Sequence, residues 1–222
     1  MQKPVLLAFD VNETLLSLRP VKEQLAELFG EDPPVGEWFA RMLHGSLVAN
    51  EIDAYRSFGV IGAEALITVA FRRSVPLARE AAEEIVTTMR SLPPHPEVPE
   101  AIERLSELGF TMVTLTNGST ETANAQVDAA GLRPFLERVI SVEEVGRFKP
   151  AAAVYSYAAE VMGVAVSEMM LVAAHDWDCA GALHAGARSA FVSRPGVFWN
   201  QAMPQPELVV SDIAQLADAL VT

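Results

Sequence analysis

The chain has 222 residues, half of them apolar and a fifth charged, which is enough for one sizeable core or a core with a smaller inserted domain. Its 16 basic and 29 acidic residues give a formal net charge of −13, which argues against nucleic acid or an anionic membrane as a partner. The single cysteine excludes an internal disulfide. Because the sequence shows no signal-peptide pattern and no apolar run of about 18 residues, we expect a cytoplasmic protein.

The first strand is predicted at residues 5–9, a continuous apolar run that suits a strand covered on both faces of a parallel sheet. Asp10 follows this run, in a polar turn that also contains Asn12 and Thr14. Ligands of parallel sheets bind outside the carboxyl ends of the strands, so Asp10 is a candidate nucleophile. On this stretch alone, the alternative that Asp10 only caps a turn with Asn12 and Thr14 is equally open.

Helices are predicted for the segment that follows. Apolar residues between positions 21 and 29 lie on one helical face, and Gly30 ends that helix. From Glu37 to Arg90 the pattern predicts several helices and no strand, and four prolines between Ser91 and Pro99 end the block. A helical block placed after a first strand predicts an insertion. We therefore expect a core domain of residues 1–16 and 93–222 and a small inserted helical cap domain of residues 17–92.

The rest of the chain alternates between strands and helices. Strands are expected at 110–116, 137–142, 169–174, 189–193 and 207–211, with a single helix after most of them. Thr120 is expected to cap one helix, and Ser211 to begin the last. This alternation predicts right-handed crossovers and therefore an α/β fold with a doubly wound parallel sheet.

Polar side chains gather where the predicted strands end, and turns at the opposite edge of the sheet show no comparable group. This coincidence favours the hypothesis that Asp10 is functional. The residues concerned are Asp10, Asn12, Thr14, Thr116, Asn117, Ser119, Lys149, His175, Asp176 and Asp178.

These residues resemble the four motifs of the haloacid dehalogenase superfamily. The motifs are a strand ending in D-x-x-x-T, a strand ending in TNGS, a Lys-Pro pair that opens a helix, and a D-x-x-G-A helix start. The pattern RFKPAAAVYSYA, together with Arg41 in the helical insert, is more similar still to the L-2-haloacid dehalogenases of type II. The resemblance implies a Rossmann-like core, an inserted cap and a homodimer.

Most members of that superfamily are magnesium-dependent phosphatases, and this chain departs from their pattern twice. A phosphatase needs a second aspartate two residues after the nucleophile as a general acid, and a carboxylate four residues before the position of Asp178 for its metal. Asn12 and Ala174 occupy these positions. We therefore expect no metal and no cofactor, with a phosphatase of altered motif as the alternative.

The resemblance instead implies a dehalogenase of small 2-haloalkanoic acids. In this reaction Asp10 displaces the halide and water then hydrolyses the aspartyl ester. Arg41 would anchor halide and substrate, Lys149 would keep Asp10 ionised, and Asp178 with His175 would orient the water. The implied catalytic residues are Asp10, Thr14, Lys149, His175 and Asp178. The implied substrate and halide site comprises Val11, Asn12, Arg41, Thr116, Asn117, Tyr155 and Trp177.

Several positions depart from the type II pattern. That family usually has an aromatic residue where this chain has Asn12, a serine where it has Thr116, and Ser-Ser-Asn where it has Ala-Ala-His at residues 173–175. His175 adds a base that an asparagine is not. A hydrolase of other small 2-carboxylates, or a binding module without catalysis, fits the same residues. A thiol–imidazole pair of Cys179 with His175 is a further alternative to helix packing by that cysteine.

Overall fold

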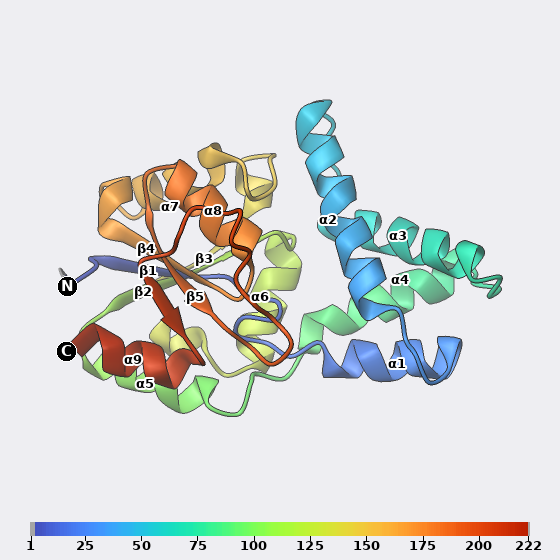
Figure 1. The fold of residues 1–222 in the computed structure, drawn as a ribbon, viewed down its shortest axis with the longest axis horizontal. Helices are drawn as coiled ribbons and strands as arrows, with labels where there is room; N and C mark the ends of the chain where they lie inside the picture. Colours follow the sequence, from blue (N-terminus) through green and yellow to red (C-terminus); the bar gives the residue numbers. More distant parts are fainter. Residues whose placement is uncertain (1–2, 222) are drawn as a thin grey trace.

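In a computed structural model, which describes residues 3–221, the predicted strands form one six-stranded sheet in which every strand pair is parallel. The strand order is β3-β2-β1-β4-β5-β6. This arrangement confirms the predicted doubly wound α/β class (Figure 1). The strands are β1 (Leu6–Phe9), β2 (Thr111–Thr116), β3 (Arg138–Ser141), β4 (Met169–Ala173), β5 (Arg188–Val192) and β6 (Leu208–Val210).

Helices cover both faces of this sheet. In Figure 1, α5 and α9 lie together on one face, and α7 and α8 lie on the other. The central strands β1 and β4 are therefore buried along their whole length, which explains why their sequences are continuously apolar rather than alternating. The helices of the core are α5 (Val98–Glu107), α6 (Thr120–Ala129), α7 (Ala152–Val161), α8 (Asp176–His184) and α9 (Ile213–Val221).

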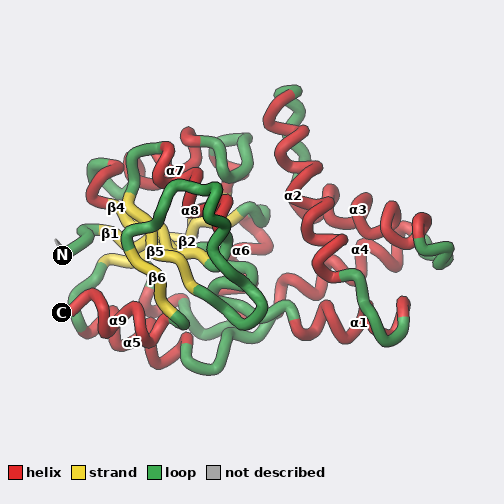
Figure 2. Tube along the Cα trace, in the orientation of Figure 1, coloured by secondary structure: helices red, strands yellow, loops and turns green. Residues whose placement is uncertain are grey.

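The helical block predicted between the first and second strands lies to one side of the sheet. Figure 2 shows that the strands are all in the other part of the described chain. The two connections to the block run side by side: the Ser17 N–H donates to the Pro93 carbonyl oxygen and the His95 N–H donates to that of Leu15, both at 2.9 Å. We propose the domain boundaries at these connections, and we call the helical block the cap. The block contains α1 (Arg19–Phe29), α2 (Val35–Glu51), α3 (Phe58–Arg72) and α4 (Arg79–Thr87).

The order of the strands places two loops at the site where such sheets bind ligands. The chain moves from β1 outward to β2 and β3, and then returns to β4 on the other side of β1. The direction of winding therefore reverses between β1 and β4, and ligands of doubly wound sheets bind at this point, outside the carboxyl ends of the strands. Asp10 directly follows β1, and His175 follows β4.

Two helix starts differ from the prediction. Helix α6 is capped by Ser119 rather than Thr120, because the Ser119 hydroxyl accepts the Thr122 N–H. The last helix begins at Ile213 and not at Ser211, since the Asp212 carboxylate accepts the Gln215 N–H in the manner of a cap. Within residues 3–221, none of the helices is long and apolar enough to cross a bilayer.

Gly181 on α8 allows that helix to lie against the loop that carries Lys149. A β-carbon at this position would lie 2.5 Å from the Pro150 β-carbon and 2.6 Å from the Tyr155 hydroxyl. We expect Gly181→Ala to lower the free energy of unfolding by about 1–3 kcal/mol, as overpacked cores do. Urea unfolding monitored by circular dichroism would measure this change.

Gly36 is the matched control, because it lies in α2 with no atom within 4 Å of an added β-carbon. We expect Gly36→Ala to be neutral or to stabilise by up to about 1 kcal/mol. If both substitutions had the same effect, the close approach of α8 to the Lys149 loop would be contradicted.

Candidate active site

Three charged side chains from distant parts of the sequence meet at the carboxyl ends of β1, β2 and β4. The Lys149 ammonium donates to Asp10 Oδ1 at 2.8 Å, to Asp178 Oδ2 at 2.5 Å and to the Leu115 carbonyl oxygen at 2.9 Å. Its side chain has no exposed surface. These bonds use all three donors of the ammonium, so Lys149 is a fixed cation beneath Asp10.

The second oxygen of Asp10 is bonded from the opposite side. Asp10 Oδ2 accepts the Thr14 hydroxyl at 2.7 Å and lies 3.1 Å from His175 Nδ1. The Thr14 hydroxyl in turn accepts the Ala174 N–H at 2.9 Å, which ties the turn after β1 to the end of β4. Burial raises the pKa of Asp10, but the charge of Lys149 and the hydrogen bond from His175 outweigh it and hold that pKa well below its usual range. Asp10 is thus an ionised, nearly buried carboxylate at neutral pH.

Asp178 has a different position from the one expected. Its Oδ1 accepts the Tyr155 hydroxyl at 2.6 Å, its Oδ2 accepts Lys149, and its side chain has no exposed surface. One oxygen is therefore engaged by Tyr155 and the other by Lys149, so the contacts of Asp178 fix the position of the Lys149 ammonium. Tyr155, expected at the substrate, lies fully buried beneath Asp178, and burial raises its pKa well above the usual value, so it stays a proton donor.

His175 lies at the start of α8 with each ring nitrogen beside a carboxylate. Nδ1 is 3.1 Å from Asp10 Oδ2, and Nε2 is 3.2 Å from Glu13 Oε2. Burial lowers the pKa of His175, but the hydrogen bonds to Asp10 and Glu13 raise it to about 10. The ring is stacked between Phe39 and Trp177, with centroids 5.5 and 5.2 Å away. His175 is therefore an imidazolium that contacts the cap as well as the core.

Glu13 and Phe39 were missed by the sequence analysis. Glu13 has a φ of 61°, in the left-handed region, and the turn that this permits directs its side chain toward His175. Its place three residues after Asp10 is the only signal for it in the sequence. Phe39 lies two residues from Arg41, and the apolar pattern of α2 marks it only as a core position.

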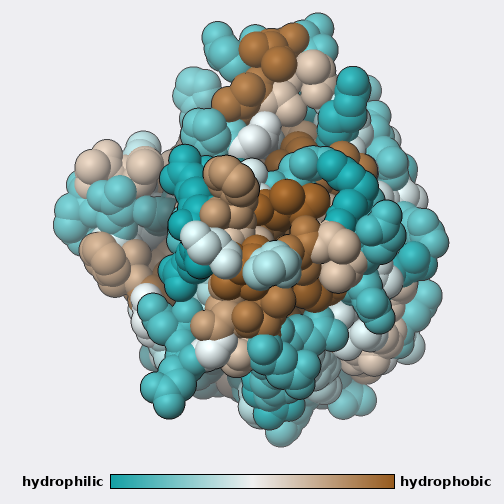
Figure 3. Space-filling model, turned by 90° about the vertical axis from the view of Figure 1, so that its right-hand side faces the viewer, coloured by the Kyte–Doolittle hydropathy of each residue, from teal (hydrophilic) through white to brown (hydrophobic). Residues whose placement is uncertain are grey.

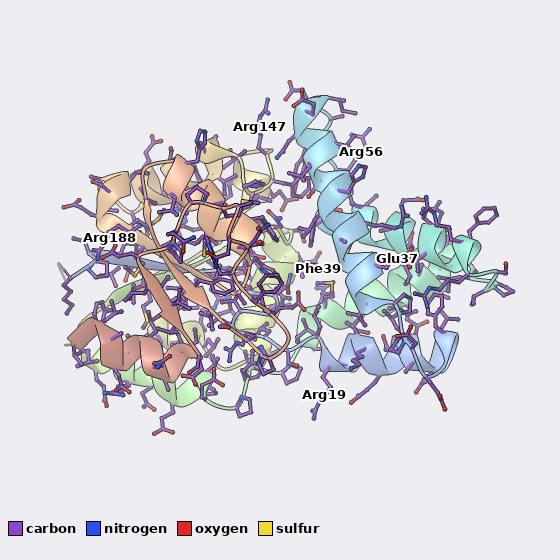
Figure 4. The ribbon with its side chains drawn as sticks, in the orientation of Figure 1. Arg19, Glu37, Phe39, Arg56, Arg147 and Arg188 are labelled. Atoms are coloured by element: carbon purple, nitrogen blue, oxygen red, sulfur yellow. The ribbon has the colours of Figure 1, made fainter. Side chains whose placement is uncertain are left out.

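The structure does not bring Arg41 to this group, contrary to the expectation that it anchors halide and substrate. Side chains two residues apart on a helix point about 200° apart. Because Phe39 faces His175, Arg41 lies on the opposite side of α2. There Arg41 lies 3.6 Å from Glu37 and lines a cavity between α2 and α3 that also contains Glu64. Figure 4 shows Phe39 on the side of α2 nearer the core and Glu37 on the farther side.

The asparagines at the site are oriented by their carbonyl oxygens. Asn12 Oδ1 accepts the buried Gln126 amide at 2.8 Å, and Asn117 Oδ1 accepts the Lys149 backbone N–H at 3.0 Å. The amide NH2 group of each remains as a donor. Thr116 shapes the same turn, because its hydroxyl accepts the Gly118 N–H at 3.1 Å. Val11, expected as an apolar wall, is buried next to Asp10 in the chain.

A hollow between cap and core reaches Asn12. It has a volume of about 30 Å³ and opens toward a cavity of about 250 Å³ between α3, α4 and the start of α6, with which it shares four residues. One wall is polar and comes from the core, and the other is apolar and comes from the cap. The core residues are Asn12, Gly118, Ser119 and Thr122, and the cap residues are Met42, Phe58, Gly59, Val86 and Met89.

The donor set at the site does not fit a divalent metal ion. In the described part of the chain, no group of three or more His, Cys, Asp or Glu residues is arranged to hold one. The Lys149 ammonium lies between the two carboxylates that would otherwise bridge a cation. Ala174, between β4 and His175, offers no ligand side chain.

Cys179 does not pair with His175. Its thiol donates weakly to the carbonyl oxygens of Ala173 and Ala190, at 3.8 and 3.7 Å, and burial raises its pKa well above the usual value. The thiol is therefore an unreactive packing group, as the more common alternative predicted.

A family model for haloacid dehalogenase-like hydrolases matches residues 5–186. This match spans the whole cap and most of the core, and the chain belongs to this family. The prediction made from the four sequence motifs is thereby confirmed.

Individual members of the family are similar over nearly the whole chain. (S)-2-haloacid dehalogenase 2 of Pseudomonas sp. (strain CBS-3) is 27% identical over 216 residues, which cover 96% of this chain and 94% of that protein. (S)-2-haloacid dehalogenase H-109 of Pseudomonas putida is 26% identical, with 96% of each covered. The solved structure of L-2-haloacid dehalogenase from Xanthobacter autotrophicus with chloropropionic acid covalently bound superposes with a TM-score of 0.91 at 20% identity, covering 98% of both chains.

The raised pKa of His175 predicts how stability depends on pH. The ordinary value is about 6.5 and the folded value about 10, so the stabilising effect of the imidazolium is complete below pH 6.5 and is lost as the pH rises toward 10. We expect the urea midpoint of the wild type to fall over this window, and that of His175→Gln to fall less. His44→Gln, at an exposed position on α2, is the control. Equal pH slopes for the wild type and His175→Gln would contradict the assignment.

Proposed function

We propose that the protein hydrolyses the carbon–halogen bond of a small 2-haloalkanoic acid through a covalent ester on Asp10, without a metal ion. The observation that carries this proposal is the Asp10 carboxylate, which is nearly buried yet kept ionised by Lys149, Thr14 and His175. The dehalogenase names of the relatives support the same reaction. The covalent adduct in the Xanthobacter autotrophicus structure supports an ester intermediate.

In the first step, one Asp10 oxygen attacks the carbon that bears the halogen. The halide leaves with the electron pair of the broken bond and needs no proton, so the amide of Asn12 suffices where a phosphatase needs an acid. The amide NH2 groups of Asn12 and Asn117 are the proposed halide contacts. The backbone of Gly118 and Ser119 at the start of α6 would receive the substrate carboxylate, since helix N-termini favour anions.

The apolar wall of the hollow fits the rest of such a substrate. Met42, Phe58 and Met89 of the cap would contact the alkyl group. The volume of about 30 Å³ has room for about one water, so we propose that a haloacid enters from the adjoining 250 Å³ cavity as the cap moves away from the core. In the second step, water attacks the acyl carbon of the Asp10 ester, which releases the 2-hydroxy acid. Lys149 polarises the ester carbonyl in this step.

Two properties of the whole molecule stay predictions. The resemblance implies a homodimer, and the exposed apolar side chains Leu47, Val48 and Ile52 of α2 are candidates for its contact. Apolar surface on the cap side of the molecule is visible in Figure 3. A cytoplasmic location likewise stays a prediction.

Chloride release from racemic 2-chloropropionate tests the proposed reaction directly. We expect release that persists in EDTA and is lost in Asp10→Asn, which retains the shape of the side chain but not its nucleophilic charge. Asp128→Asn is the matched control, because Asp128, on α6, is an exposed carboxylate that pairs with Arg133. After single turnover in heavy-oxygen water, mass spectrometry should find the label on Asp10.

Two results would count against this mechanism. Label in the product alone, with none on Asp10, would exclude the ester. Magnesium-dependent turnover of p-nitrophenyl phosphate, without chloride release, would favour the phosphatase alternative.

The orientation of α2 predicts different consequences for two neighbouring substitutions. Arg41 faces away from the site, so we expect Arg41→Gln to change kcat/KM by less than about twofold. Phe39→Ala removes the ring stacked on His175, an interaction of about 0.5–1.5 kcal/mol, and should lower kcat by up to about tenfold. Steady-state chloride release measures both. A rise in KM of more than tenfold for Arg41→Gln would instead place Arg41 at the substrate.

A further inference from the structure

The imidazolium of His175 lies between two carboxylates, and only one of them takes part in the proposed reaction. Asp10 meets Nδ1 at 3.1 Å, and Glu13 meets Nε2 at 3.2 Å. Nothing in the ester chemistry of Asp10 requires Glu13. Its side chain is 36% exposed, whereas that of His175 is 12% exposed, so this pair connects the nucleophile to solvent.

The second step needs a base, and the other polar groups at Asp10 are unsuited to that role. Lys149 has all three donors engaged, and both oxygens of Asp178 are occupied. The Thr14 hydroxyl donates to Asp10 and accepts the Ala174 N–H. Among the described residues that bond to the Asp10 side chain, His175 is the one that titrates and has exposed surface.

Formation of the ester changes the electrostatics of His175. While Asp10 is ionised, two negative charges hold the imidazolium proton. The ester is neutral, so one of these charges disappears, whereas the nearby Lys149 cation remains. The groups that then face the ring are Glu13 from the β1 turn, Phe39 from α2 and Trp177 from α8, with Asp176 next to it in α8. Loss of a neighbouring negative charge weakens the hold on a proton.

Glu13 also determines which nitrogen becomes free. A neutral imidazole retains one N–H, and a carboxylate beside Nε2 keeps the proton there. The lone pair of Nδ1 then points toward the acyl group of Asp10. The Glu13 backbone lies in the left-handed region, with φ of 61°, and its carbonyl oxygen lies 3.2 Å from His95 Nε2. A glutamate in this region is strained, and such strain is retained mainly where it serves function.

We propose that His175 is the general base of ester hydrolysis, positioned by Glu13, and that esterification of Asp10 switches it from counter-ion to base. This inference rests on the proposed function. In the resting enzyme His175 stabilises the ionised nucleophile. After halide leaves, the Nδ1 proton of His175 passes to solvent while Glu13 retains the proton on Nε2, so Nδ1 becomes able to accept a proton from water.

The hydrolysis step then balances. Water bonds to the acyl carbon as His175 Nδ1 takes one of its protons. The bond from the acyl carbon to the substrate oxygen breaks, and that oxygen takes the proton from His175. Asp10 leaves this step as the carboxylic acid and returns its proton to His175. The sum is haloacid plus water giving hydroxy acid, halide and one proton.

The switch itself is testable without turnover, because Asp10→Asn imitates the neutral ester. Proton NMR of the imidazole signals against pH gives the pKa of each histidine. We expect the pKa of His175 to fall from about 10 in the wild type toward the ordinary value of about 6.5 in Asp10→Asn. The signal of His44, exposed on α2, is the internal reference. A His175 pKa that stays near 10 in Asp10→Asn overturns the switch.

Single-turnover kinetics with 2-chloropropionate test the catalytic role. We expect His175→Gln to release one equivalent of chloride at nearly the wild-type rate, and then to hydrolyse the Asp10 ester about 100-fold more slowly. Mass spectrometry should detect the accumulated ester. Glu13→Gln should slow hydrolysis about tenfold and move its pH profile to lower pH, since the neutral amide no longer supports the imidazolium. Glu13→Asp should restore part of the rate, and Asp128→Asn should match the wild type.

These outcomes separate the two proposals. Multiple turnovers at the wild-type rate in His175→Gln overturn the base assignment and leave the dehalogenase proposal intact. Slow hydrolysis with an unchanged pH profile in Glu13→Gln overturns the role of Glu13. A wild-type enzyme that releases no halide from any 2-haloacid overturns the dehalogenase proposal, and the base assignment with it.

Discussion

The site depends on a buried cation held by three acceptors from different elements. Lys149 contacts the turn after β1 through Asp10, strand β2 through the Leu115 carbonyl oxygen, and helix α8 through Asp178. An ammonium without exposed surface is tolerated only when it is fully paired, and removal of one partner of such a pair typically costs about 3–5 kcal/mol. The turn after β1, strand β2 and helix α8 are therefore coupled energetically through Lys149. A shift of any of these elements would leave an unpaired charge in the core.

Asp10 is consequently influenced by two cations of different kinds. Lys149 has no exposed surface and no free donor, so its charge is constant throughout a reaction. His175 is close to solvent, is paired with Glu13, and is stacked on Phe39 of the cap. Its proton responds to the charge of Asp10. One cation thus keeps Asp10 ionised, whereas the other connects Asp10 to Phe39 of the cap.

The sequence predicts the parts of this arrangement that follow from topology. Asp10, Lys149 and His175 lie where buried strands or their loops end, and parallel strands bring such ends to one edge of the sheet. Orientation could not be predicted in the same way. Arg41 and Phe39 are two residues apart on a helix, and only the packing of α2 on the core decides which of them faces the site. The position of Glu13 depends on a left-handed backbone conformation that no residue pattern announces.

In the proposed reaction, the same charges determine which leaving groups the site can expel. A carboxylate nucleophile with an amide two residues later can expel a group that is stable as an anion, but it has no acid there for a poor leaving group. The hydrogen bonds of His175 to Asp10 and Glu13 hold its proton in the resting state, with a pKa of about 10, so His175 is a weak acid while the first bond breaks. In the proposed reaction, esterification of Asp10 weakens that hold, and the His175 proton becomes mobile only for the second step. The order of the two steps would therefore be determined by the charge of Asp10 itself. Formation of the ester removes the negative charge that holds the His175 proton, and His175 can then act as the base that hydrolyses this ester.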